Sequence, residues 1–292
     1  MRLFLIRHGE TVDNIAQLYA GSRDSELTNH GVSQATRLGQ HFRSTGVKFT
    51  HIFSSQLQRA YKTADIVRQA QSGPLVLQSP LIAEQDFGSS EGKSWASRAS
   101  IDPDMNDQPV IPSESRESME SRVDQFLDSH LEPIIAPTDS TEQIIAVVSH
   151  GIILGVLWRR ILRRLPPQSV TLSPEIAATN AMIVLEHLGR WGNTCYLELT
   201  LTSKSATGAG IVAMTTSGTL AATLQPIPRD MQPGNNTASL VSHFGEFTTT
   251  ISRVNARDHL KSLKRTGGGV GSAKYDSSQP GIETFFKKPR KT

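Results

Sequence analysis

The sequence has a single cysteine and no long hydrophobic run. Because Cys195 stands alone, no intramolecular disulfide can form, which fits a reducing compartment. The longest apolar run, residues 152–158, is ended by two arginines, Arg159 and Arg160, and is too short to cross a bilayer. The N-terminal apolar stretch is also short and runs into charged residues, unlike a signal peptide. We therefore expect a cytoplasmic or nuclear protein with no membrane partner.

Positive charge is sparse in most of the chain and concentrated near its end. From Arg253 to Thr292 there are ten Lys and Arg against three Asp and Glu, whereas the preceding 252 residues have twenty against twenty-four. Such a basic end indicates a nuclear or nucleic-acid-linked setting more than a substrate preference. Direct binding of nucleic acid is left open.

The first ten residues indicate a catalytic arrangement. Residues 1–6 are an apolar run that predicts a buried strand, and Arg7, His8 and Gly9 follow at once. Open α/β sheets bind ligands at the carboxyl ends of their strands. Arginine presents a fork of donors that matches phosphate oxygens, and glycine lets a substrate approach the backbone. Since imidazole can be a nucleophile, the group indicates a histidine that attacks a phosphoryl group.

The same design recurs later in the chain. Residues 144–149 are another apolar run, and it ends in His150 and Gly151. Residues 52–55 predict a further strand, after which Arg59 lies near the start of a helix, where backbone N–H groups favour an anion. Two histidines and two arginines at strand ends can surround one phosphoryl group.

A carboxyl group for proton transfer is offered by the loop after the short strand predicted over 75–78. Glu84 is the candidate to protonate a leaving oxygen. Asp86 and Glu91 lie close by and are alternatives for the same work, whereas Glu10 is interpreted as structural.

Together these motifs resemble the histidine phosphatase superfamily, also called the phosphoglycerate mutase-like family. The resemblance spans roughly residues 1–200 and rests on motifs in the family's order: Arg7-His8-Gly9-Glu10-Thr11, Asn14, Ser54-Ser55 to Arg59-Ala60, Thr63-Ala64, Glu84 to Phe87-Gly88, Glu91-Gly92 and Ser149-His150-Gly151. It implies a three-layer α/β/α fold, with helices on both faces of a mostly parallel central sheet.

The resemblance also implies a role for each matching residue. His8 is the nucleophile and becomes a phosphohistidine, and Glu84 is the general acid and then the base that activates water. The phosphoryl group is bound by Arg7, Asn14, Arg59, His150 and Gly151. No metal or other cofactor is implied, because arginine and protonated His150 supply the positive charge.

The family contains both hydrolases and mutases. Its mutases carry extra cations after the Glu84 loop, whereas residues 95–116 here have no adjacent arginine pair, and Phe87 stands where those mutases have tyrosine. Both departures favour a phosphomonoester hydrolase. A phosphoglycerate-type mutase and a weakly active scaffold are the alternatives. A sugar phosphate, a nucleotide and a phosphoprotein all stay open as substrates.

Hydrophobic periodicity predicts alternating strands and helices. Helices are expected over 29–45, 59–71, 114–131 and 152–165. Strands are expected over 1–8, 49–54, 75–78, 144–149, 181–188 and 195–201, with a last strand starting at Phe247.

The composition divides the chain into a folded body and flexible segments. Residues 1–202 and 244–262 are assigned to the histidine phosphatase domain. Residues 203–243, rich in Ser, Thr, Ala, Gly and Pro, are interpreted as a low-complexity flexible insertion. Residues 263–292 are interpreted as a disordered basic tail.

The tail contains a second motif, over residues 279–286. Its four positions, Gln279, Ile282, Phe285 and Phe286, resemble the peptide that docks on the replication sliding clamp, PCNA. In one helical turn the three apolar side chains meet on one side and can fill a pocket, and the lysines and arginine that follow can steer binding. The resemblance implies that the clamp is a partner of this protein, in addition to a small phosphorylated substrate. The basic cluster fits a nuclear localisation signal.

Overall fold

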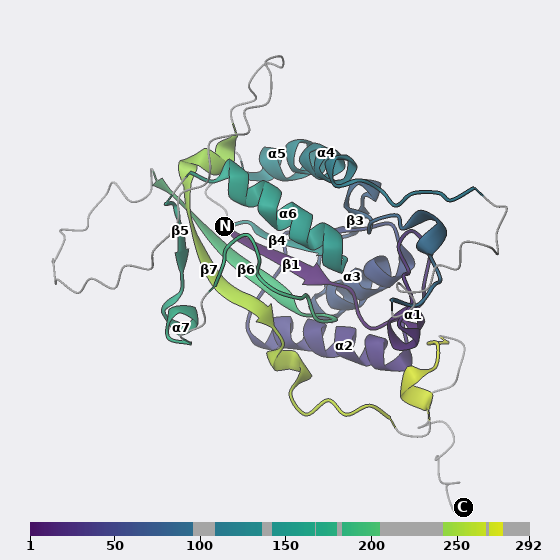
Figure 1. Cartoon of the computed structure of the whole chain (residues 1–292). Coiled ribbons are helices and arrows are strands. Elements are labelled where there is room, and N and C mark those ends of the chain that lie inside the picture. Colours follow the sequence, from purple (N-terminus) through teal and green to yellow (C-terminus); the bar gives the residue numbers. More distant parts are fainter. Residues whose placement is uncertain are drawn as a thin grey trace, which may run out of the picture.

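The protein is built around a seven-stranded sheet with the strand order β3-β2-β4-β1-β6-β7-β5 (Figure 1). A computed structural model describes residues 1–95, 109–135, 142–166, 168–179, 183–204, 242–266 and 269–276. The strands are β1 (Arg2–Arg7), β2 (His51–Ser54), β3 (Val76–Gln78), β4 (Ile144–Ser149), β5 (Val170–Leu172), β6 (Tyr196–Ser203) and β7 (Phe247–Ala256). β6 is antiparallel to both its neighbours, and all other pairings are parallel.

Helices cover both faces of this sheet (Figure 1). They are α1 (Val12–Ala16), α2 (Asn29–Ser44), α3 (Gln58–Gln71), α4 (Arg116–Phe126), α5 (Glu132–Ile135), α6 (Gly151–Arg164) and α7 (Pro174–Ala177). α2 and α3 lie on one face, and α4, α5 and α6 lie on the other. The predicted three-layer fold with a mostly parallel sheet is confirmed.

The central strand β1 shows why two apolar layers form. Successive side chains of a strand point to opposite faces. Leu3 and Leu5 belong to the core under α4 and α6, whereas Phe4 and Ile6 belong to the core under α2 and α3. All four are at most 1 % exposed. A strand buried on both faces reads as a continuous apolar run, which is why residues 1–6 indicate it so clearly.

Most predicted elements are confirmed with shifts of a few residues at their ends, but the strand predicted over 181–188 is wrong. In its described part, residues 183–188, the chain makes a tight turn with one isolated bridge. The Trp158 indole N–H donates to the Leu185 carbonyl over 2.5 Å, so this segment is fixed to α6. The sheet edge is occupied by β5, whose three residues are too few for a periodic pattern.

The predicted insertion of residues 203–243 separates two paired strands. β6 and β7 run side by side from Tyr196 and Ala256 to Ser203 and Phe247. The last strand predicted from Phe247 is therefore confirmed. Residues 205–241 lie outside the described residues, so the flexible insertion stays a prediction.

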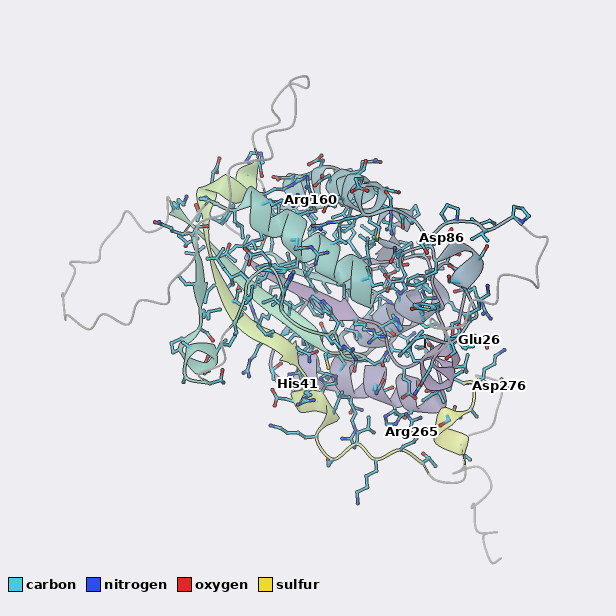
Figure 2. The ribbon with its side chains drawn as sticks, in the orientation of Figure 1. Glu26, His41, Asp86, Arg160, Arg265 and Asp276 are labelled. Atoms are coloured by element: carbon cyan, nitrogen blue, oxygen red, sulfur yellow. The ribbon has the colours of Figure 1, made fainter. Side chains whose placement is uncertain are left out.

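The beginning of the predicted disordered tail differs from that prediction, because its described residues lie against the folded body. Arg265 forms an ion pair with Glu10, and Lys274 Nζ lies 2.6 Å from a carboxylate oxygen of Glu26. The Tyr275 N–H donates to the Leu27 carbonyl over 2.9 Å. Figure 2 places Arg265 and Glu26 on the side of the molecule where α2 begins. The clamp motif, residues 279–286, lies outside the described residues and stays a prediction.

A close approach of two backbones joins α2 to the segment after β1, and it yields a stability prediction. A Cβ at Gly31 would lie 2.1 Å from the Glu10 carbonyl oxygen. We expect Gly31→Ala to lower the free energy of unfolding by about 1–3 kcal/mol, because the backbones must move apart. Gly245→Ala is the control, since its Cβ would meet nothing within 4 Å. Urea unfolding of both variants measures the difference, and equal midpoints would contradict the prediction.

Candidate active site

The two predicted histidines come together at the carboxyl edge of the sheet. His8 follows β1 and His150 follows β4, and these strands are parallel neighbours in which Arg7 is opposite Ser149. The imidazole centroids are 5.1 Å apart. Both side chains are buried, with exposed fractions of 4 % and 0 %. The strand pairing therefore places both rings in one enclosed site.

A hydrogen bond fixes the tautomer of His8. Its Nδ1 lies 2.6 Å from the Gly9 carbonyl oxygen. A carbonyl oxygen can only accept, so Nδ1 carries the hydrogen and donates it. In the neutral ring, Nε2 then holds a free lone pair, which is the form that a nucleophilic imidazole requires.

His150 has the opposite tautomer. The Arg59 Nε–H donates to His150 Nδ1 over 3.1 Å, so Nδ1 is the acceptor and Nε2 carries the hydrogen. Among the described residues this buried Nε2 has no hydrogen-bond partner, and the same holds for Nε of Arg7. Two buried donors without acceptors are costly. An oxyanion between them would remove that cost.

The surroundings keep both imidazoles neutral. Burial, followed by the charges of Arg7 and Arg59, lowers the pKa of His8 well below the usual value. Burial, followed by the charges of Arg59 and His8, does the same to the pKa of His150. The structure therefore differs from the expectation that His150 is protonated, because the Arg59 donor already occupies Nδ1 and burial lowers the pKa of the ring.

Backbone carbonyls hold the two arginines in place. Arg59, 1 % exposed in the first turn of α3, donates from Nη1 to Arg23 O and from Nη2 to Gly21 O, each over 2.7 Å. Arg7 Nη1 donates to Trp191 O over 2.6 Å. Burial lowers the pKa of both arginines, and the Glu84 carboxylate opposes that effect. Both guanidinium groups are thus held by backbone acceptors inside the site.

Glu84 lies at the N-terminus of α6. Its carboxylate accepts the N–H groups of Ile153 over 3.1 Å and Ile152 over 3.3 Å. Helix N-termini stabilise negative charge. Gly151, the first residue of α6, is thus adjacent to both the general-acid candidate and the phosphoryl-binding residues.

The loop that carries Glu84 is fixed from α4 by Arg122. This arginine donates to the carbonyls of Ala83 over 2.7 Å and of Glu84 over 3.3 Å. It also forms an ion pair with Glu114 at 2.8 Å. Arg122 has no motif signal in the sequence, since an arginine inside an amphipathic helix is ordinary.

The two alternative carboxylates have structural contacts. Glu91 accepts the backbone N–H of Ser22 over 2.6 Å and that of Phe87 over 3.2 Å, so it joins two loops. Asp86 accepts the Gly88 N–H over 2.6 Å within its own turn. Glu84 also accepts backbone N–H groups, but these belong to the start of α6 directly after His150, so its position keeps it the candidate for proton transfer.

Asn14 is linked to the nucleophile by a residue that the sequence analysis misses. Asn193 Nδ2 donates to Asn14 Oδ1 over 3.1 Å and to the His8 carbonyl over 3.2 Å. Since Asn14 Oδ1 is occupied, its amide nitrogen is the group left for a phosphoryl oxygen. Asn193 lies in the irregular loop before β6, where periodicity carries no information.

A second loop residue, Thr194, supports the nucleophile through the backbone. Its N–H donates to the Arg7 carbonyl over 3.0 Å. Its hydroxyl lies 2.9 Å from Nε2 of His259. Burial lowers the pKa of His259 to about 4, so this histidine is neutral near pH 7.

Two other kinds of feature are absent from the described ranges. No three His, Cys, Asp or Glu side chains gather there in a way that could hold a metal ion. Among the helices of these ranges, none is both long enough and apolar enough to span a membrane.

Comparison with known proteins agrees with this geometry. The family model of the histidine phosphatase superfamily (branch 1) matches residues 3–192. The chain belongs to the histidine phosphatase superfamily. Within this superfamily it is similar to a probable phosphatase of Schizosaccharomyces pombe, 29 % identical over 97 % of this chain and 79 % of that protein. A probable phosphoglycerate mutase, GpmB of Erwinia tasmaniensis, is 36 % identical over 56 % of this chain and 75 % of its own length. These relatives support a phosphatase or a mutase.

Solved structures share the histidine phosphatase fold. A mycobacterial hydrolase covers 88 % of this chain and 99 % of its own, with a TM-score of 0.55 and 22 % identity. A mycobacterial glucosyl-3-phosphoglycerate phosphatase complexed with VO3 covers 69 % of this chain and 91 % of its own, with a TM-score of 0.50 and 25 % identity.

The neutral imidazoles of His8 and His150 lead to a pH prediction. An unfolded histidine has a pKa of about 6.5, above that of His8 and His150 in the folded protein. Above that pH neither state binds the proton, and below it the unfolded chain is protonated first. We expect the free energy of unfolding to fall by about 1 kcal/mol per imidazole from about pH 7.5 to 5.5. Denaturant titration at both pH values measures the fall.

The variants His8→Asn and His150→Asn provide the comparison for this prediction. Each removes one buried imidazole, so each should show a smaller fall than the wild type. An identical fall in all three proteins would mean that the two rings do not cause it.

Proposed function

We propose that this protein is a metal-independent phosphomonoester hydrolase that forms a phosphohistidine on His8. The proposal rests above all on one observation. Beside the neutral His8, whose Nε2 has a free lone pair, Arg7 Nε and His150 Nε2 are buried donors that lack partners in the part of the chain that the structure describes. Transfer of a phosphoryl group from a phosphate ester requires a nucleophile next to donors that are free to bind the phosphoryl oxygens.

In the first step the His8 Nε2 lone pair attacks phosphorus in line with the leaving oxygen. Arg7, Arg59 and the Nε2–H of His150 bind the equatorial oxygens, whose charge must be stabilised in the transition state. The bond from phosphorus to the leaving oxygen breaks, and the Glu84 carboxyl gives its proton to that oxygen. The N–H groups of α6 then stabilise the resulting carboxylate.

In the second step water attacks the phosphohistidine. The Glu84 carboxylate takes a proton from the water as its oxygen bonds to phosphorus. The bond from phosphorus to Nε2 breaks, and the electron pair returns to His8. Phosphate leaves, and the Gly9 carbonyl still holds the starting tautomer.

Hydrolysis accounts for the chain better than a mutase reaction. The phosphatase relative aligns with 97 % of this chain, whereas the mutase relative aligns with 56 %. Residues 95–116 have no adjacent arginine pair with which a mutase could retain a bisphosphorylated intermediate. Turnover measurements distinguish a weakly active scaffold from both enzymes.

Trapping the intermediate tests the nucleophile. We expect wild-type protein quenched during turnover of a ³²P-labelled ester to carry an acid-labile, base-stable label, as a phosphoramidate does. His8→Asn should carry none and should release phosphate at least about 10³-fold more slowly, since the covalent route is closed. His187→Asn is the control, because that side chain is exposed and lies in another loop. Near-normal turnover by His8→Asn would refute the scheme.

The leaving group tests the role of Glu84. We expect Glu84→Gln to lower kcat by about 10²–10⁴-fold for an alkyl ester such as glycerol 3-phosphate. The loss should be much smaller for p-nitrophenyl phosphate, whose leaving group needs no proton. Asp86→Asn serves as the control and should lower both rates little and equally. An equal loss on both esters in Glu84→Gln would assign proton transfer to another group.

A further inference from the structure

The loop before β6, residues 191–194, contacts three residues of the phosphoryl site. β6 is antiparallel to both β1 and β7, so its first residues lie at the sheet edge where those two strands end. Groups of this loop form hydrogen bonds with the Arg7 guanidinium, the His8 carbonyl and the Asn14 side chain. Contacts that fix the loop therefore also fix the phosphoryl site.

The backbone of this loop has a conformation that few residues adopt readily. Thr194 has a φ of +56°, in the left-handed region, which is unusual for a β-branched residue. It is 0 % exposed, and its N–H donates to the carbonyls of both Arg7 and His8, over 3.0 and 3.2 Å. Such a backbone persists only where the surrounding structure holds it. Contacts from other elements must therefore stabilise the loop.

Two side chains, at the end of β7 and just after it, provide such contacts. Asn255 Oδ1 accepts the Gly192 N–H over 2.9 Å. The Nε2 of His259, a buried residue, lies 2.9 Å from Thr194 Oγ1. The loop is also closely packed here, since a Cβ at Gly192 would lie 2.6 Å from Cys195 Sγ. The loop is thus held from one side by β1 and from the other by the end of β7 and the residues that follow it.

The Thr194 hydroxyl determines which hydrogen connects His259 to the loop. Its oxygen lies 2.7 Å from the Asn193 carbonyl oxygen, which can only accept, so the single hydroxyl hydrogen is donated there. Burial lowers the pKa of His259 to about 4, so the ring is neutral near pH 7 and must donate to Thr194 from Nε2. Its Nδ1 is buried and has no partner among the described residues. A single N–H, on Nε2, therefore connects this imidazole to the loop.

We propose that His259 and Asn255 are positioning residues that keep the phosphoryl site in its active geometry through residues 191–194. The proposal rests on the proposed hydrolase function, and neither side chain takes part in bond breaking. Without their contacts the loop relaxes from its left-handed conformation, and the groups that hold Arg7 and Asn14 shift with it. Displacements of about 1 Å in such supporting groups lower rates by about 10²-fold. The end of β7 thus serves catalysis as well as the sheet.

Glutamine and asparagine at position 259 test which ring nitrogen matters. The amide nitrogen of glutamine takes the place of Nε2, whereas that of asparagine takes the place of Nδ1. We expect kcat for p-nitrophenyl phosphate to fall about 10²-fold in His259→Asn and His259→Leu, and less than about threefold in His259→Gln. The loss should follow the missing N–H and not the size of the side chain, which a role in packing alone would not produce. Each kcat is measured on protein that denaturant titration shows to be folded.

A double-mutant cycle with Thr194→Val tests the hydrogen bond itself. Valine keeps the β-branched shape and removes the hydroxyl. Because both side chains act through one bond, Thr194→Val combined with His259→Leu should lower kcat no more than about twofold beyond either single variant. Losses that multiply in the double variant would overturn the inference.

Asn255 offers an independent pair of variants, which decides the question if the His259 variants do not fold. Asn255→Asp keeps an acceptor for the Gly192 N–H, and its kcat should stay within about threefold of the wild-type value. Asn255→Gly suits the left-handed backbone at this position, where φ is +47°, but removes the acceptor, so kcat should fall about tenfold or more. Equal kcat values in these two variants would overturn the role of Asn255.

His41→Leu is the control, since it removes a neighbouring ring whose hydrogen bond goes to β6 instead of the loop. The centroid of the His41 ring lies 6.1 Å from that of His259, and its Nε2 lies 3.2 Å from the Tyr196 hydroxyl. Its kcat should stay within about threefold of the wild-type value. A loss as large as that in His259→Leu, or equal losses in His259→Gln and His259→Leu, would overturn the inference and leave the hydrolase function standing.

Failure of the wild type on both p-nitrophenyl phosphate and glycerol 3-phosphate would instead contradict the hydrolase function. Calorimetric binding of inorganic phosphate then tests the positioning role without turnover, because Arg7 and Asn14 depend on the loop. We expect about tenfold weaker binding in His259→Leu and the wild-type affinity in His259→Gln. Equal affinity in all three proteins would overturn the inference.

Discussion

Two hydrogen bonds to ring nitrogens determine what this site can do. The Gly9 carbonyl makes His8 Nδ1 a donor, and the Arg59 Nε–H makes His150 Nδ1 an acceptor. One ring is left with a lone pair on Nε2 and the other with a hydrogen there. The parallel pairing of β1 and β4 then sets these unlike nitrogens beside each other. A single reversed tautomer would offer two donors or two lone pairs, and neither arrangement can both attack and bind a phosphoryl group.

Keeping this arrangement requires the protein to bury positive charge. Arg7 and Arg59 are enclosed with two imidazoles, and desolvation acts against all four. Charged groups are tolerated in an interior only when they are well hydrogen-bonded. Backbone carbonyls and the Glu84 carboxylate supply part of that compensation. In the proposed mechanism a bound phosphoryl group would supply acceptors for the two buried donors that lack them among the described residues.

The sequence predicts those parts of the site that lie at strand ends. His8, His150 and Arg59 each follow or closely succeed a buried apolar run, so periodicity locates them. Asn193 and Arg122 cannot be predicted in this way, for two different reasons. Asn193 lies in the irregular loop before β6, where no periodic pattern marks its position. Arg122 looks like any polar residue of an amphipathic helix. The segment 183–188 shows the opposite error, because its apolar residues pack on α6 rather than alternate along a strand.

The position of β1 in the sheet also sets the order in which the protein can assemble. β1 is made before its two neighbours, β4 and β6, which begin at Ile144 and Tyr196. Such long-range pairing must wait until most of the chain has left the ribosome, and it folds slowly. The loop that supports the His8 carbonyl is made just before β6. His8, the proposed nucleophile, is therefore synthesised well before the strands and the loop that fix it in place.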